Sequence, residues 1–213
     1  MNKDPVVLSY DESLLRKSDV ELLHGPYWLN DNIISFYFEY LKNTFKNAPQ
    51  MLFVSPEVTQ CIKIIPGSQM KVFLDPLDAA NKHFIFFALN DNEKPQSVGG
   101  THWSLLLYSR ADQTVYHYDS SRGSNSEQAE SFARKLFAYF DVRGQFKEEV
   151  SLQQDNGYDC GIYLICNAEC LAKHLARYNS VESYDNLNGE LRDSVGGMRG
   201  EIVNVIEKLR VSS

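Results

Sequence analysis

The sequence lacks a long hydrophobic run, both at its start and further along. Its longest unbroken apolar stretch, Phe84 to Leu89, is far shorter than the roughly 20 residues that a membrane helix needs. The first residues, Met-Asn-Lys-Asp-Pro, contain no apolar segment of the kind found in secretory signals. We therefore expect a soluble protein of the cytoplasm, the nucleus or both, with no membrane contact.

Cysteine is scarce, with four in 213 residues, and its spacing excludes the common metal-binding patterns. There is no Cys-x-x-Cys pair, and none of the five histidines stands at zinc-ligand spacing from a cysteine. Cys160, Cys166 and Cys170 fall on what should be one helix, which is a poor layout for disulfides. We expect reduced thiols in a reducing compartment, no metal and no cofactor.

Basic residues are also few, because 21 Lys and Arg stand against 28 Asp and Glu, for a net charge of −7. A nucleic-acid-binding protein would need a basic face, so the charge favours a partner whose contact surface is basic. The hydrophobic fraction of 43% and the aromatic fraction of 12% are typical of a packed globule. Without repeats or a low-complexity linker, the sequence predicts a single domain over residues 1–213.

Hydrophobic periodicity predicts an α+β fold, with a helical N-terminal part and a mixed central sheet. Ser18 and Glu21 have capping-box spacing, Asn30 or Asp31 can cap the next helix, and Ser55 precedes a proline at the start of a third. Further helices are expected over 125–140, from 159 or 160 onward and over 200–209. Strands are expected over 83–89, 101–108, 114–118 and 146–152.

The strands 101–108 and 114–118 should form a hairpin that builds a catalytic pair. If Arg110 and Ala111 are at the centre of the turn, His102 lies directly across from Asp119. Opposed side chains have Cβ atoms about 4.5–5.5 Å apart, close enough for a hydrogen bond between imidazole and carboxylate. The pattern predicts a base with its orienting acid, although a register shifted by one would leave an ordinary polar pair.

Cys160 stands where a polar turn runs into an apolar helix. The positive end of a helix dipole favours the thiolate form of a cysteine in its first turn. Asp155 and Asp159 oppose that effect, so a nearby imidazolium such as His102 is needed. A passive thiol at a helix start is the alternative interpretation. The remaining cysteines are predicted to be core thiols: Cys61, Cys166 and Cys170.

Gln154 lies shortly before Cys160 and carries a side-chain amide. Such an amide can donate a hydrogen bond to the oxyanion that forms when a carbonyl is attacked. From its position alone, Gln154 is better explained as a turn residue. With His102 and Asp119, however, it would complete the parts of a thiol hydrolase.

Three motifs carry these residues: Thr101-His102-Trp103-Ser104, Tyr118-Asp119-Ser120 and Gln154-x-x-Gly157-x-Asp159-Cys160-Gly161. Together they resemble the Ulp/sentrin-specific protease family, which removes ubiquitin-like modifiers from lysines and trims their precursors. The stretches 5–10, 28–31, 55–60 and 88–102 look like the deneddylase branch, which cleaves the neddylation modifier instead of SUMO. The resemblance covers nearly the whole chain, but it places nothing in residues 179–213.

The resemblance implies a papain-like cysteine protease fold of the Ulp type, with the nucleophile at a helix N-terminus and no cofactor. It implies that His102, Asp119 and Cys160 form the triad and that Gln154 is the oxyanion donor. The implied reaction is cleavage after the C-terminal Gly-Gly of the modifier. The implied partners are the neddylation modifier and its conjugates, such as cullins.

The resemblance also implies a substrate channel. Trp28 and Trp103 would flank the Gly-Gly tail, and Asp31 would help to read the residues before the glycines. Strand alternation alone would point Trp103 away from His102, so its role rests on the resemblance. Without the resemblance, Trp28 would be interpreted as a core aromatic and Asp31 as a helix cap.

Three alternative functions remain at this stage. A desumoylating protease would use the same chemistry on another modifier, because specificity is a small difference of affinities spread over a surface. An acyltransferase would use the same triad, but two tryptophans beside the motifs favour a Gly-Gly channel. An inactive modifier-binding module is disfavoured by the intact catalytic set.

Overall fold

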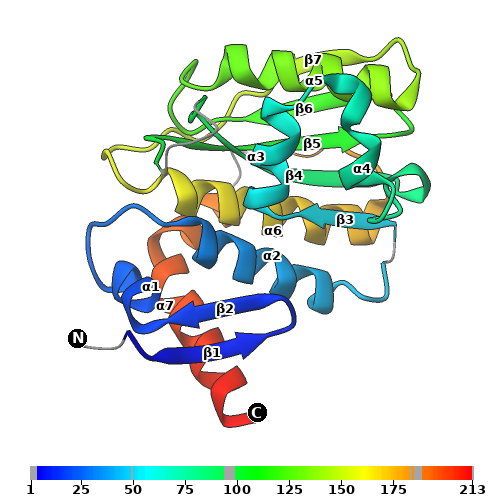
Figure 1. The fold of residues 1–213 in the computed structure, drawn as a ribbon. Helices are drawn as coiled ribbons and strands as arrows, with labels where there is room; N and C mark the ends of the chain where they lie inside the picture. The colour runs from blue at the N-terminus through cyan, green and yellow to red at the C-terminus, as the bar shows by residue number, and fades with distance from the viewer. Residues whose placement is uncertain (1–3, 49, 94–98, 183, 185–188, 213) are drawn as a thin grey trace.

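The computed structural model describes residues 4–48, 50–93, 99–182, 184 and 189–212 (Figure 1). Its strands are β1 (Val6–Tyr10), β2 (Ser13–Arg16), β3 (Met51–Val54), β4 (Phe84–Asn90), β5 (Trp103–Ser109), β6 (Thr114–Tyr118) and β7 (Gln145–Glu148). Its α-helices are α1 (Lys17–Glu21), α2 (Asp31–Thr44), α3 (Pro56–Ile64), α4 (Lys71–Leu74), α5 (Ser126–Phe140), α6 (Cys160–Tyr178) and α7 (Gly189–Ser212). Short 3-10 turns, among them η1 (Leu22–His24), connect some of them.

A five-stranded mixed sheet in the order β3-β4-β5-β6-β7 forms the centre of the fold. β4, β5 and β6 are antiparallel neighbours, whereas the outer strands β3 and β7 run parallel to the strands beside them. This confirms the predicted α+β class and the mixed sheet. The helix that carries Cys160 at its N-terminus, α6, packs against β5.

Both faces of the sheet are covered by helices, which explains why β4 is apolar from Phe84 to Leu89. Phe84, Phe86 and Ala88 of β4 belong to a core cluster with α2 and α6, on one face. The alternate residues, Ile85, Phe87 and Leu89, belong to a second cluster with α3, α4 and α5, on the other face. A strand buried on both sides has no polar position, so it shows a continuous hydrophobic run instead of alternation.

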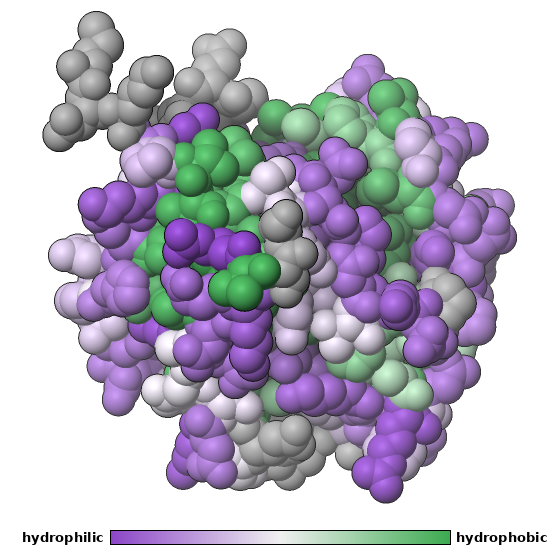
Figure 2. Space-filling model, turned by 90° about the horizontal axis from the view of Figure 1, so that it is seen from below, coloured by the Kyte–Doolittle hydropathy of each residue, from purple (hydrophilic) through white to green (hydrophobic). Residues whose placement is uncertain are grey.

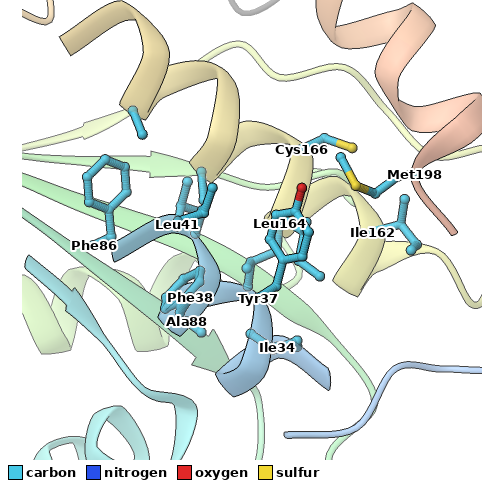
Figure 3. Packing of buried hydrophobic residues seen from close by; sticks show 14 of the residues in the cluster. Ile34, Tyr37, Phe38, Leu41, Phe86, Ala88, Ile162, Leu164, Cys166 and Met198 are labelled. Carbon is cyan, nitrogen blue, oxygen red and sulfur yellow. The ribbon is translucent and has the colours of Figure 1, made fainter. Parts of the chain in front are cut away.

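The larger core holds α6, and thereby Cys160, in a fixed place. Figure 3 shows side chains of α2 next to those of β4 on one side and those of α6 on the other. The residues come from α2 (Ile34, Tyr37, Phe38 and Leu41), β4 (Phe86 and Ala88) and α6 (Ile162 and Leu164). Met198 of α7 lies beside Cys166 on the far side of α6 (Figure 3). Because such interiors are close-packed, α6 presents its first turn at a fixed position.

The N-terminal part contains the helices α1, α2 and α3, in line with the prediction, but residues 6–16 form a β1–β2 hairpin that was not predicted. In β2, Ser13 and Leu15 are buried whereas Leu14 and Arg16 are exposed, so this strand follows the two-residue alternation of a sheet covered on one face. Figure 2 views the molecule from the side of this hairpin, where hydrophilic residues cover most of the face. The hairpin packs its apolar side on α2 and α7.

Two of the expected helix caps are present and one is not. The side chains of Asn30 and Ser55 accept the backbone N–H groups of Ile33 and Val58 at 3.2 and 3.4 Å, so Asn30, not Asp31, caps α2. The expected Ser18–Glu21 capping box is absent, because α1 begins at Lys17 and Arg16 occupies the N-cap position, two residues before Ser18. The last helix covers 189–212 and is longer than expected.

None of the helices in the described segments is long and apolar enough to cross a membrane.

Candidate active site

Cys160 is the first residue of α6 and is only 2% exposed. Its thiol therefore lies at the positive end of the dipole of a 19-residue helix, which favours the thiolate. The next residue is Gly161, where a Cβ would come within 3.0 Å of Leu29 Cβ. The chain therefore needs a glycine there for α6 to approach the segment that follows Trp28.

His102 and Asp119 meet, but not through the pairing expected for the hairpin. The register places Leu105 across from Tyr118, which would put His102 opposite Ser121 and not opposite Asp119. Because the shift is of two residues, the two side chains still share a face. His102 Nε2 lies 2.5 Å from Asp119 Oδ1, both residues being buried.

His102 interacts with Cys160 as well as with Asp119. Burial lowers the pKa of His102, but the hydrogen bonds with Asp119 and Cys160 outweigh it and raise the pKa to about 9. Since Asp119 holds Nε2, Nδ1 is the nitrogen left for the thiol. An imidazole that stays protonated at neutral pH is the charge that a cysteine thiolate needs beside it.

Asp119 is fixed by three hydrogen bonds. Besides His102, Ser121 N donates to Oδ1 at 2.8 Å and Asn125 N donates to Oδ2 at 3.1 Å. Burial raises the pKa of Asp119, but the hydrogen bonds from His102 and Ser121 prevail and the pKa lies below its usual value. The carboxylate therefore stays ionised and keeps the imidazolium charged and oriented.

Gln154 presents an amide whose orientation is fixed. Its Oε1 accepts the hydroxyl of Ser120 at 2.7 Å, and its Nε2 donates to Asn156 O at 2.6 Å. The backbone N–H of Gln154 also donates to Ser120 O at 2.9 Å. Because an amide nitrogen carries two hydrogens, one N–H is left that could donate to an oxyanion, and this role of Gln154 remains a prediction.

The two tryptophans are each anchored by a hydrogen bond from the indole N–H to a backbone carbonyl. Trp28 Nε1 donates to Gly157 O, in the loop before Cys160, and the side chain of Trp28 is 48% exposed. Trp103 is buried, and its Nε1 donates to Leu29 O at 3.1 Å. The interpretation of Trp28 as a core aromatic was wrong. The role of both in a tail channel remains a prediction.

Asp31 is the exposed first residue of α2. Desolvation and the neighbouring carboxylate of Glu57 raise its pKa. Two acidic groups at this end of α2 would suit a basic or hydrogen-bond-donating segment of a partner.

All four cysteines are free thiols. Cys166 and Cys170 are buried on α6, as predicted, and burial raises the pKa of Cys166 well above its usual value, which keeps this thiol protonated. Cys61 on α3 was predicted to be a core thiol but is only partly buried.

Sequence reasoning missed the groups that hold the catalytic residues in place. Ser120 orients Gln154, and Asn125, which stands at the N-cap position of α5, holds Asp119. Ser120 lies inside a motif already singled out, and an asparagine before a helix is a local signal. Arg199 had no such signal, because its partners are distant in the chain.

The His102–Asp119 pair should make stability depend on pH in a defined window. The folded-state pKa of His102 is raised from 6.5 to about 9, so the pair's contribution is fully present below pH 6.5 and lost as the pH rises through 9. We expect the melting temperature of the parent protein to fall more over this window than that of His102→Ala. Thermal melts at several pH values check this, with exposed His24→Ala as control. Parallel curves would mean that His102 is neutral in the folded protein.

The comparisons with known proteins agree with this geometry. Residues 27–195 match the model of the Ulp1 protease family, C-terminal catalytic domain. The chain is 49% identical over 180 residues to sentrin-specific protease 8 of Homo sapiens, covering 82% of this chain and 84% of the relative. It is 31% identical over 219 residues to NEDD8-specific protease 1 of Arabidopsis thaliana, covering 99% and 96%.

Solved structures agree in fold. The Ulp1 protease domain in complex with Smt3, the yeast ortholog of SUMO, superposes with a TM-score of 0.76 at 18% identity, covering 98% of this chain and 90% of that one. The sheet, the helix that begins at Cys160 and the order of the motifs thus agree with one family of cysteine proteases. The chain belongs to the Ulp1 protease family.

Proposed function

We propose that the chain is a deneddylase: a cysteine protease that cleaves after the C-terminal Gly-Gly of the neddylation modifier, NEDD8. It would release the modifier from lysines of conjugates and trim its precursor. The observation that carries the chemistry is the imidazole of His102, which bonds to the carboxylate of Asp119 and to the thiol of Cys160.

In the first half of the reaction, the Cys160 thiolate attacks the carbonyl carbon of the terminal glycine. The new C–S bond turns the carbonyl oxygen into an oxyanion, which Gln154 Nε2 and the Cys160 backbone N–H stabilise. As the C–N bond breaks, protonated His102 gives its proton to the leaving lysine amine. The modifier is then held as a thioester on Cys160.

In the second half, water replaces the amine. Neutral His102 takes a proton from the water, and the resulting hydroxide attacks the thioester carbon. The C–S bond breaks, the thiolate–imidazolium pair is restored, and the modifier leaves as a carboxylic acid that loses its remaining proton to the solvent. Asp119 remains ionised throughout, because hydrogen bonds hold its pKa low.

The choice of modifier is supported by the relatives, not by the triad. A protein named for NEDD8 specificity shares 31% identity over nearly the whole chain, whereas the superposed SUMO complex supports the fold alone at 18%. The acidic pair of Asp31 and Glu57 offers a surface for reading the modifier's last residues. We also propose that the substrates include conjugates such as cullins. We place the protein in a reducing compartment, the cytoplasm or the nucleus, and the four free thiols fit such a compartment.

A panel of activity probes tests the function. Ubiquitin, SUMO and NEDD8, each carrying an electrophile at its C-terminus, are mixed with the protein and labelling is followed by intact mass. We expect rapid labelling by the NEDD8 probe and much slower labelling by the others. Preference for the SUMO probe would show a desumoylating protease, and binding without labelling would show an inactive module.

Trp28 provides a test of the tail channel. An indole wall that fits a Gly-Gly backbone rejects an added methyl, at a cost of about 1–3 kcal/mol. We expect a Gly-to-Ala change at the penultimate tail position to lower kcat/KM of the parent by roughly 10-fold or more. In Trp28→Ala, activity should fall but the Gly/Ala ratio should shrink, because the wall is gone.

The matched control is Tyr178→Ala, at the far end of α6, since Tyr178 is also an exposed aromatic. It should leave both activity and the ratio unchanged. An unchanged ratio in Trp28→Ala would exclude Trp28 from the channel.

A further inference from the structure

Arg199 of α7 is bonded to the loop that carries the nucleophile. Its Nε and Nη2 donate to Asp159 Oδ1 at 3.1 and 2.7 Å, and Asp159 is the residue directly before Cys160. Asp159 is therefore not used as a helix cap; its other oxygen accepts Asn156 Nδ2 at 2.9 Å. The guanidinium and the carboxylate are both about four-fifths buried, with side-chain exposures of 20% and 19%.

The same guanidinium reaches the segment before Trp28. Nη1 donates to Leu22 O at 2.7 Å, and Nη2 donates to Tyr27 O at 2.8 Å. Arg199 thus bridges three parts of the chain: α7, the residues that lead to Trp28, and the residue before Cys160. Trp28 itself bonds to Gly157 O, so the two segments are joined at two points.

The charge of Asp159 explains why this bridge bears on catalysis. A carboxylate next to the nucleophile disfavours the thiolate, and a cation within hydrogen-bond distance of that carboxylate cancels most of its field. His102 interacts with the thiol and with Asp119, and Asp155 lies five residues before Cys160 in the same loop. Without Arg199, two aspartates in this loop would oppose the single imidazolium.

Apolar packing also holds α7 against the rest of the fold. Buried apolar side chains of α7 already dock it on the larger core: Leu191, Met198, Ile202, Val205 and Ile206. The family match ends at residue 195, before Arg199. Burying an ion pair costs desolvation free energy, and here four of the five guanidinium N–H groups are committed to hydrogen bonds. Such a cost indicates that the geometry of the pair serves a purpose.

We propose that Arg199 is a positioning residue for Cys160, which neutralises Asp159 and ties the nucleophile loop to the segment of Trp28. The inference rests on the proposed thiol protease function and extends it to the C-terminal helix. It predicts two separable effects: an electrostatic one on the thiolate, and a geometric one on the distance between Cys160 and the channel wall.

The electrostatic effect is measured without any modifier. Cys160 is alkylated with iodoacetamide at pH 5 to 10, and its modification is followed by peptide mass spectrometry. In Arg199→Gln the midpoint of the profile should move up by about one pH unit. Adding Asp159→Asn should bring it back to the parent value. An unmoved midpoint in folded Arg199→Gln would overturn the electrostatic role.

The geometric effect is measured as turnover of a fluorogenic NEDD8 amide. Arg199→Gln should lower kcat/KM by roughly 10-fold or more. The double variant with Asp159→Asn should recover only part of this loss, because the bonds to Leu22 O and Tyr27 O stay broken. Arg199→Lys keeps the charge and should hold the alkylation midpoint while losing turnover. Arg210→Gln, which removes an exposed ion pair on the same helix, is the control and should change neither.

The outcomes separate the two proposals. If the parent protein turns over no modifier, the proposed function fails, yet the alkylation profiles still decide the role of Arg199. The positioning role is overturned if Arg199→Gln keeps kcat/KM within about twofold of the parent and its alkylation midpoint within about 0.2 pH units. Both limits are on the order of the measurement error. If Arg199→Gln does not fold, Arg199→Lys and Asp159→Asn decide it through the same two measurements.

Discussion

Replacing Cys160 with alanine is expected to abolish cleavage of NEDD8 conjugates, with a loss of turnover of roughly a million-fold, as for removal of a protease nucleophile. Binding of the modifier should persist, because recognition depends on a surface and not on one sulfur atom. The fold should be kept as well, since alanine only shortens a side chain at the start of a helix. Turnover assays and calorimetric binding check both statements.

The probe adduct provides the matching positive evidence. One adduct per parent molecule is expected, on Cys160, and none on Cys160→Ala. Cys61→Ala is the control, because Cys61 is the only one of the four cysteines that is not buried. Its labelling should equal that of the parent. An adduct on Cys61, Cys166 or Cys170 would show that the nucleophile has been wrongly assigned.

Most of the sheet and of α6 could be predicted because local patterns determine them. β6 has the expected bounds, β4 differs from the expected range by one residue at each boundary, and α5 differs by one residue at its start. The N-terminal hairpin was missed because β2 merges into α1 without a break and the capping spacing at Ser18 favoured a helix. β3 was missed because a strand of four residues has no clear period.

The hairpin register shows why a wrong detail left the site intact. The connection between Ser109 and Thr114 is longer than assumed, with Gln113 at a φ of 50°. Asp112 stabilises it by accepting the Ser109 hydroxyl at 2.7 Å. A slip of two residues keeps every side chain on its face, whereas a slip of one would have separated His102 from Asp119.

Arg199 could not be found from the sequence for a different reason. Its partners lie far away along the chain, in the segment 22–27 and at Asp159, and only the packing of α7 against the core brings them together. Periodicity and caps report neighbours within a few residues, so they carry no information about such a contact.

Replacing Asp119 with asparagine is expected to lower kcat by roughly 10²–10⁴, in analogy with the serine proteases. The carboxylate keeps His102 charged, so its loss should lower the pKa of His102 from about 9. The alkaline limb of the kcat profile should then move to lower pH, because neutral His102 has no proton for the leaving amine. The amide also fits the site poorly, since Ser121 N and Asn125 N both donate to the carboxylate oxygens and one of them would face an NH2 group.

The measurement is a set of kcat and KM values for a fluorogenic NEDD8 amide between pH 6 and 10, with Asp112→Asn in the same hairpin as control. The loss should fall on kcat much more than on KM, because Asp119 acts on the reacting groups and lies away from the modifier surface. Asp112→Asn should leave both constants near the parent values, since Asp112 bonds only to Ser109 and Tyr116 among the side chains that the structure describes. An unchanged kcat in Asp119→Asn would mean that the 2.5 Å contact with His102 Nε2 is a structural ion pair with no part in the proton transfers.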